Sequence, residues 1–154
     1  MAGNDMESQE KMEAEVQEDL MRLEAYRNQL SASLQQHQML TGSRAEHDRA
    51  RESLEGVDRA TVDAELLIPL GGETFVRGTV DRSAPVLIGM GSGVVVEMER
   101  PKVAELLAER LVKIDQAIRD LEGQMNALDE RIQLLSRRLE SVSHDPASGH
   151  VGGD

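Results

Sequence analysis

The residues that could do chemistry in this sequence are a glycine-rich stretch and a few histidines. Glycine occupies alternate positions at Gly89, Gly91 and Gly93, as in loops that cradle phosphate groups. Nucleotide-binding loops, however, have the spacing G-x-G-x-x-G or end in G-K-[ST], and they lead into a helix. This stretch has neither spacing, and strand-forming residues follow it. It therefore favours a tight hairpin turn.

The histidines and carboxylates do not form a catalytic or metal-binding pattern. None of the histidines belongs to the metalloprotease pattern H-E-x-x-H, in which two histidines at i and i+4 enclose a carboxylate, so we expect solvated side chains of the surface or the tail at His37, His47, His144 and His150. Acidic runs such as Glu18-Asp19 are likewise expected to be solvated. With no nucleophile and base pair, the sequence argues against an enzyme and predicts no cofactor and no metal.

Composition limits the class of protein further. The net charge of −12 disfavours nucleic acid and anionic membranes as partners, and the acidic start of the chain resembles neither a signal peptide nor a membrane span. There is no cysteine, which is compatible with a reducing cytosol. Of the 17 basic residues only Lys11, Lys102 and Lys113 are lysine. This arginine-rich, acidic surface suits either a halophilic host or a GC-rich genome.

The second half of the chain predicts a long helix with a narrow apolar seam. Apolar residues recur at alternating steps of four and three, which is the heptad pattern of a coiled coil. The run comprises Leu107, Leu111, Ile114, Ile118, Leu121, Met125, Leu128, Ile132, Leu135, Leu139 and Val142. Pro101 suits the first turn, and Pro146 follows the end of the pattern.

The first half predicts a second, less regular helix. Val16, Leu20, Leu23, Leu30 and Leu34 keep the heptad step, but Arg27 interrupts it. The apolar residues then change phase after His37, which predicts a stammer near Gly42. An antiparallel pairing of the two helices matches four pairs: Leu20 with Leu139, Leu23 with Leu135, Leu30 with Leu128, and Leu34 with Met125. The other half of the hairpin stays unspecified, because Arg44 and Asp48 would face Ile114 and Leu111.

Between the helices, four short runs of aliphatic and β-branched residues predict two β-hairpins. The runs are residues 64–70, 73–81, 85–90 and 94–98, with tight turns at Gly71-Gly72 and at residues 91–93. Four short strands with open edges are not stable on so small a core, so we expect them to pair with other subunits. The residues expected to serve oligomerisation are Leu67, Ile68, Phe75, Val76, Val80, Val86, Leu87, Ile88, Val94, Val95 and Val96.

The order of long helix, LIPLGGETFVRGTV, VLIGMGSGVVVE and second long helix resembles the alpha class of archaeal prefoldin. The resemblance covers nearly the whole chain. The second hairpin assigns the chain to the alpha class, because the beta class of that family has a single hairpin. It implies a hexamer of two alpha-class and four beta-class subunits, whose hairpins form intersubunit β-barrels. It also implies ATP-independent capture of unfolded proteins at the coiled-coil tips, delivery to a group II chaperonin, and a cytoplasmic location.

The expected organisation is α+β, with residues 1–58 as the first helix, 59–100 as the hairpin platform, 101–143 as the second helix and 144–154 as a disordered tail. Client binding is expected at the distal ends of both helices, where flexible methionines gather. The expected residues are Met6, Met12, Val16, Leu20, Met21, Leu135, Leu139 and Val142. A coiled-coil scaffold or adaptor without client-holding activity is the alternative.

Overall fold

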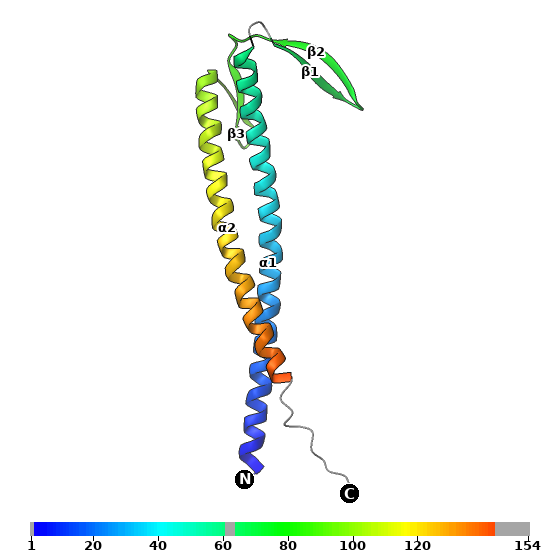
Figure 1. The fold of residues 1–154 in the computed structure, drawn as a ribbon, viewed down its shortest axis with the longest axis vertical. Helices are drawn as coiled ribbons and strands as arrows, with labels where there is room; N and C mark the ends of the chain where they lie inside the picture. Colours follow the sequence, from blue (N-terminus) through cyan, green and yellow to red (C-terminus); the bar gives the residue numbers. More distant parts are fainter. Residues whose placement is uncertain (1, 61–63, 144–154) are drawn as a thin grey trace. The chain divides into compact units, whose positions relative to one another are not determined.

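The computed structural model describes residues 2–60 and 64–143, and contains two long helices and four short strands (Figure 1). The elements are α1 (Ala2–Arg59), β1 (Ala64–Gly71), β2 (Thr74–Val80), β3 (Val86–Gly91), β4 (Val94–Met98) and α2 (Arg100–Ser143). The predicted fold of two long helices joined by two β-hairpins is confirmed. The tail predicted at residues 144–154 lies outside the described residues. No helix in the described part is long and apolar enough to span a membrane.

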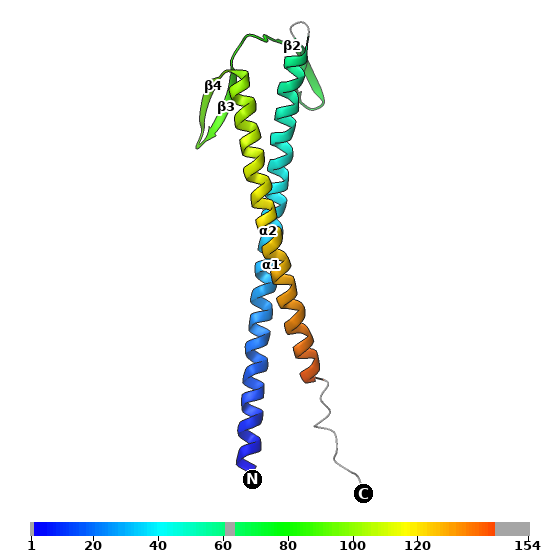
Figure 2. The same ribbon diagram turned by 60° about the vertical axis from the view of Figure 1, so that its left-hand side comes forward.

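The chain divides into two compact units. One consists of Met1–Met39 with Arg119–Asp154, and the other is Leu40–Ile118. In the first unit, the start of α1 and the end of α2 lie antiparallel, as the views in Figures 1 and 2 agree. Leu23, Leu121 and Leu128 are buried there. The second unit holds the end of α1, the start of α2 and both hairpins.

The less exposed face of α1 repeats every three and four residues without a break. Its members are Val16, Asp19, Leu23, Tyr26, Leu30, Ser33, His37, Leu40, Arg44, His47, Arg51 and Leu54. The predicted stammer is therefore wrong. Two residues assigned to the seam, Leu20 and Leu34, are 45% and 46% exposed, while their neighbours Asp19 and Ser33 occupy the seam. The search for apolar residues selected Leu20 and Leu34 instead of their neighbours, because half of the true seam positions of α1 are polar.

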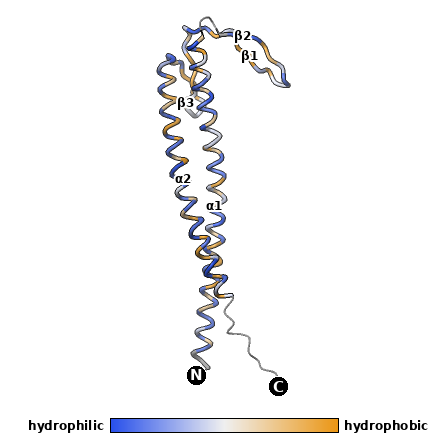
Figure 3. The backbone as a smooth tube through the Cα atoms, viewed as in Figure 1, coloured by the Kyte–Doolittle hydropathy of each residue, from blue (hydrophilic) through white to orange (hydrophobic). Residues whose placement is uncertain are grey.

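The seam of α2 agrees with its sequence pattern. Leu107, Leu111, Leu121 and Leu128 are buried, and the other members of the predicted run are half-buried apart from Val142, which is exposed at the end of the helix. Figure 3 shows polar and apolar residues alternating along the helices, as a seam with solvated outer faces requires. The two helices therefore pair an apolar face on α2 with a mixed face on α1.

The two β-hairpins are built to the same plan. Ile68 pairs with Val76 in the first, and Ile88 pairs with Val96 at the corresponding place in the second. Each hairpin also has a register shift just before its turn, at Pro69/Gly71 and Gly89/Gly91. Positive φ angles occur at Gly71, Gly72 and Glu73, and again at Gly91, Ser92 and Gly93. Such consecutive left-handed residues are typical of tight hairpin turns, which explains the glycines.

One hairpin packs on the helices of its own unit. The side chain of Ile88 on β3 is buried with Val103 and Leu107 of α2. Leu54, Val86, Met98 and Leu106 surround this cluster. Because burial of large aliphatic side chains stabilises a fold by about 1.5–3 kcal/mol each, this cluster fixes β3–β4 against the start of α2.

Candidate binding surfaces

The β1–β2 hairpin exposes apolar side chains on both faces. Directly paired residues of antiparallel strands share a face, so the pairing places Leu66, Ile68 and Val76 together. All three are exposed. The opposite face carries Leu67 and Phe75, also exposed, beside an ion pair of 3.0 Å between Arg77 Nη1 and Glu65 Oε1. Within residues 40–60 and 64–118, nothing covers these faces.

The β3–β4 hairpin leaves only part of its surface free. Ile88 is 7% exposed, whereas its counterpart Ile68 on the first hairpin is 49% exposed. On the outer face, Leu87 and Val95 remain exposed, and Val94 is exposed beside the turn. Of the residues predicted to serve oligomerisation, Ile88 is thus covered by its own subunit, and Val80 and Val86 are half-buried. The exposed members remain candidates.

A mainly apolar pocket of about 320 Å³ lies beside this cluster in the second unit. Its walls come from the end of α1, from β2 and β3, and from the start of α2. The lining residues include Leu54, Val57, Val80, Val86, Arg100 and Val103. An open apolar pocket next to exposed strands is suited to receive an apolar side chain from a neighbouring chain.

Arg100 links the elements that meet at the pocket. Its side chain is largely buried, and donates from Nη1 to Asp58 Oδ1 at 3.0 Å and from Nη2 to the carbonyl of Asp81 at 2.7 Å. The Asp81 carboxylate accepts hydrogen bonds from the hydroxyl and backbone N–H of Ser83. These bonds hold the pKa of Asp81 below its ordinary value. Arg100 therefore ties α1, the end of the first hairpin and α2 together.

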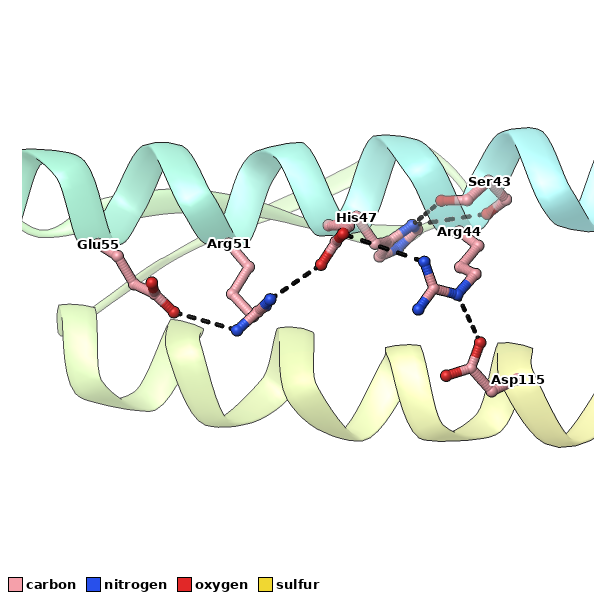
Figure 4. A network of polar contacts seen from close by, with 7 residues as sticks. Ser43, Arg44, His47, Arg51, Glu55 and Asp115 are labelled. Carbon is pink, nitrogen blue, oxygen red and sulfur yellow. Dashed lines mark hydrogen bonds and ion pairs between the residues drawn. The ribbon is translucent and has the colours of Figure 1, made fainter.

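In the half of the seam that the sequence left unspecified, α1 contributes several charged side chains (Figure 4). Arg44 Nε donates to Asp115 Oδ1 of α2 at 2.6 Å. Arg51 bridges Asp48 and Glu55 of its own helix, and the hydrogen bond to Asp48 is the main reason that the pKa of Arg51 is raised. Ion pairs thus occupy the positions where sequence analysis looked for apolar partners.

The histidines in the described residues are only partly solvated, and both have polar partners that the sequence did not predict. His37 Nε2 lies 3.1 Å from Glu122 Oε1. His47 Nδ1 lies 2.8 Å from the carbonyl of Ser43. Both are half-buried because they occupy seam positions of α1. His144 and His150 lie outside the described residues.

A buried carboxylate lies in the seam of the first unit. Asp19 is 5% exposed, and its Oδ2 forms an ion pair with Arg138 Nε at 3.2 Å. Arg138 Nη2 also contacts Glu15 at the same distance. The expectation that Glu18-Asp19 is a solvated run is therefore wrong for Asp19. Charged residues at seam positions fix register and orientation in coiled coils, usually with a loss of stability.

The residues predicted to bind clients fall into two groups. Met6, Met12 and Met21 are exposed on α1, together with Leu20. Of the three residues predicted on α2, Val142 is exposed, whereas Leu135 and Leu139 are half-buried in the seam, as is Val16 of α1. Figure 2 shows the first turns of α1 projecting beyond the last described turn of α2. Apolar side chains are therefore available at this end of the unit without any opening of the seam.

The ion pair between Asp19 and Arg138 makes a testable prediction. Arg138→Met leaves the carboxylate buried without its partner, and we expect it to destabilise this end of the coiled coil by about 1–2 kcal/mol, because Arg138 is itself half-exposed. Asp19→Leu with Arg138→Met should restore or exceed the original stability. Hydrogen exchange of amides near residues 16–23 measures this, and those near 103–111 serve as the reference. Equal exchange in the single and double variants would contradict the prediction.

Sequence reasoning missed Asp19 and Arg100, and it placed Arg44 in the seam without its ion-pair partner Asp115. A signal for Asp19 and Arg44 was present, because alternating steps of four and three through Leu23 and Leu30 reach both positions. No local signal marked Arg100, whose partners Asp58 and Asp81 are distant in sequence. Across the described part of the chain, no group of three or more histidine, aspartate or glutamate side chains could hold a metal ion.

Comparison with known proteins gives a consistent picture. The family model described as "Prefoldin subunit" matches residues 26–145. Prefoldin subunit alpha of Pyrococcus horikoshii is 29% identical, over 68% of this chain and 72% of its own length. The same subunit of Methanopyrus kandleri is 31% identical, over 71% of this chain and 73% of its own length.

Solved structures share the fold. A filamentous prefoldin (PFD) from Methanocaldococcus jannaschii, determined by cryo-EM, aligns with a TM-score of 0.63 at 18% identity, covering 75% of this chain and 95% of that chain. The prefoldin beta subunit from Thermococcus strain KS-1 aligns with a TM-score of 0.57 at 22% identity, covering 86% and 95%. At such identities these structures support the arrangement of helices and hairpins and nothing finer.

Proposed function

This chain belongs to the prefoldin family of chaperones, in its alpha class, and from that premise we propose that it is a subunit of an ATP-independent holdase that captures unfolded polypeptides. The proposed complex contains two alpha-class and four beta-class subunits, and acts in the cytoplasm. It would pass its clients to a group II chaperonin. A halophilic host remains compatible with the net charge of −12.

The single observation that carries the assembly proposal is the uncovered β1–β2 hairpin. Leu66, Ile68 and Phe75 are exposed on a two-stranded sheet whose outer edges have no partner strand within residues 64–118. An isolated two-stranded hairpin is marginally stable in water, and its free edges invite pairing. Strands from beta-class subunits would satisfy the edges and bury the apolar faces together.

The distal ends of the helices support the capture step. Met6, Met12 and Met21 are exposed and adaptable, which suits a surface that accepts many apolar sequences. Weak sites on several arms would hold one client through multivalency. None of these contacts needs nucleotide, in line with a glycine stretch that forms a hairpin turn at Ser92 and Gly93.

The first experiment measures native mass by light scattering for the chain recovered from its host at host-like salt. We expect the mass of a hexamer with a second subunit in twofold excess, and suppression of the aggregation of a denatured client without ATP. A homodimer that leaves aggregation unchanged would contradict the proposal and favour the adaptor alternative.

A further inference from the structure

The exposed apolar residues at the start of α1 lie within a strip of carboxylates. Stepping by four and three along the helix gives one exposed strip: Met6, Glu10, Glu13, Gln17, Leu20 and Glu24. Residues at this spacing are neighbours on a helix surface, with Cβ atoms about 5–6 Å apart. Met6 therefore adjoins Glu10, while Leu20 and Met21 both adjoin Glu24.

Charge along this segment of α1 is strongly one-sided. Between residues 5 and 24 the only basic side chains are Lys11 and Arg22. The carboxylates of that segment are Asp5, Glu7, Glu10, Glu13, Glu15, Glu18, Asp19 and Glu24. The potential at the apolar residues is thus negative, and nearby cations are attracted.

Within residues 5–60 and 65–143, the three carboxylates of the strip, like Asp5 and Glu7 outside it, are exposed, make no ion pair and are free to meet a ligand. Glu18 forms an ion pair with Arg22, and both Glu15 and Asp19 form ion pairs with Arg138. Among the side chains described in 5–60 and 65–143, Glu10, Glu13 and Glu24 make no ion pair, and all three are exposed. They are the carboxylates of the strip itself, interleaved with Met6 and Leu20.

We propose that this strip, Met6 to Glu24, selects unfolded segments in which apolar residues are flanked by lysine or arginine. The apolar side chains anchor the segment, and a basic residue one or two positions away meets Glu10, Glu13 or Glu24. Segments flanked by acidic residues are disfavoured, because like charges face each other across the contact. This inference rests on the proposed holdase function and names the client chemistry of that same site.

The test uses the assembled complex and three fluorescent peptides with one shared apolar segment, flanked by lysine, glutamine or glutamate. Fluorescence anisotropy at about 50 mM salt should rank their affinities lysine, then glutamine, then glutamate. Because each exposed ion pair contributes a factor of up to about five and the two flanks of the lysine peptide can form two such pairs, we expect its affinity to exceed that of the glutamine peptide about tenfold. The span should collapse near 1 M salt, where the screening length is about 3 Å.

The variant Glu10→Gln, Glu13→Gln, Glu24→Gln removes the charges with little change in size. It should lower the affinity of the lysine peptide to that of the glutamine peptide, and leave the glutamine peptide unaffected. The matched control is Glu46→Gln, Glu52→Gln, Glu109→Gln, three exposed carboxylates of the other unit, which should change neither affinity.

Failure of this inference differs from failure of the proposed function. If all three peptides bind equally, or if the control variant has the same effect as the strip variant, the charge preference is overturned and the holdase function stands. If none of the peptides binds the assembled complex, both are overturned. Helix content by circular dichroism shows that the strip variant keeps α1 intact.

Discussion

Replacing Leu135 and Leu139 with serine is expected to abolish client holding while leaving assembly intact. Both side chains are half-buried at seam positions of α2, in the unit that contains Met12 and Leu20. Two serines remove the apolar side chains that α2 contributes to the seam near its end, so the exposed residues of α1 would be left to hold a client from one side only. Suppression of client aggregation measures the loss.

The matched control for this pair is Leu134→Ser. Leu134 is adjacent in sequence but 64% exposed on the outer face of α2. Its substitution therefore shows the effect of replacing a leucine with serine outside the seam. It should leave holding within about twofold of the unchanged chain. Native mass should stay the same in both variants, because the hairpins belong to the other unit. If the double variant suppresses client aggregation as well as the unchanged chain does, Leu135 and Leu139 do not belong to the client site.

Ile88→Asp is expected to destabilise the subunit by more than about 3 kcal/mol. Truncation of a buried isoleucine alone costs about 2–5 kcal/mol, and a buried carboxylate without a partner adds to this. The side chain is packed with Val103 and Leu107, so the β3–β4 hairpin would detach from α2. Urea unfolding measures the free energy, and limited proteolysis near Gly91 shows the release of the hairpin.

Leu87→Asp is the matched control for that substitution. Leu87 is the adjacent residue on the opposite face of β3 and is 66% exposed. The free energy of unfolding of the Leu87→Asp variant should differ from that of the unchanged chain by less than about 1 kcal/mol, because a surface substitution buries no charge. If the two aspartate variants unfold alike, Ile88 does not anchor the hairpin in solution.

The two helices show which part of a coiled coil can be predicted from sequence. In α2 the seam is apolar at nearly every position, so its phase follows from the pattern alone. In α1, polar residues such as Asp19, Arg44 and Arg51 share the seam with Leu23 and Leu30. The apolar Leu20 and Leu34 lie one position outside it. A search for apolar periodicity therefore selected the wrong neighbours and inferred a phase change that the helix does not have.

The hairpins were predictable for a different reason. Glycines at Gly71 and Gly91 mark conformations that other residues rarely adopt, so turn positions could be identified from sequence. Glu73, which also has a positive φ, gave no such signal. Nor does the sequence distinguish Ile68 from Ile88, since both lie in similar strands. Only the packing of β3–β4 on α2 determines which of the two is buried.

Because the two hairpins are buried to different extents, damaging substitutions in them should have different effects. A damaging substitution on the inner face of β3–β4, such as at Ile88, unfolds the subunit itself. A substitution at the corresponding Ile68, which is half-exposed, should leave a folded subunit with a defect in the proposed docking face. Cellular quality-control proteases recognise unfolded chains, and so would remove the first kind and pass over the second. Defects in the hairpin proposed to bind partner subunits would thus be the ones that protein quality control fails to remove.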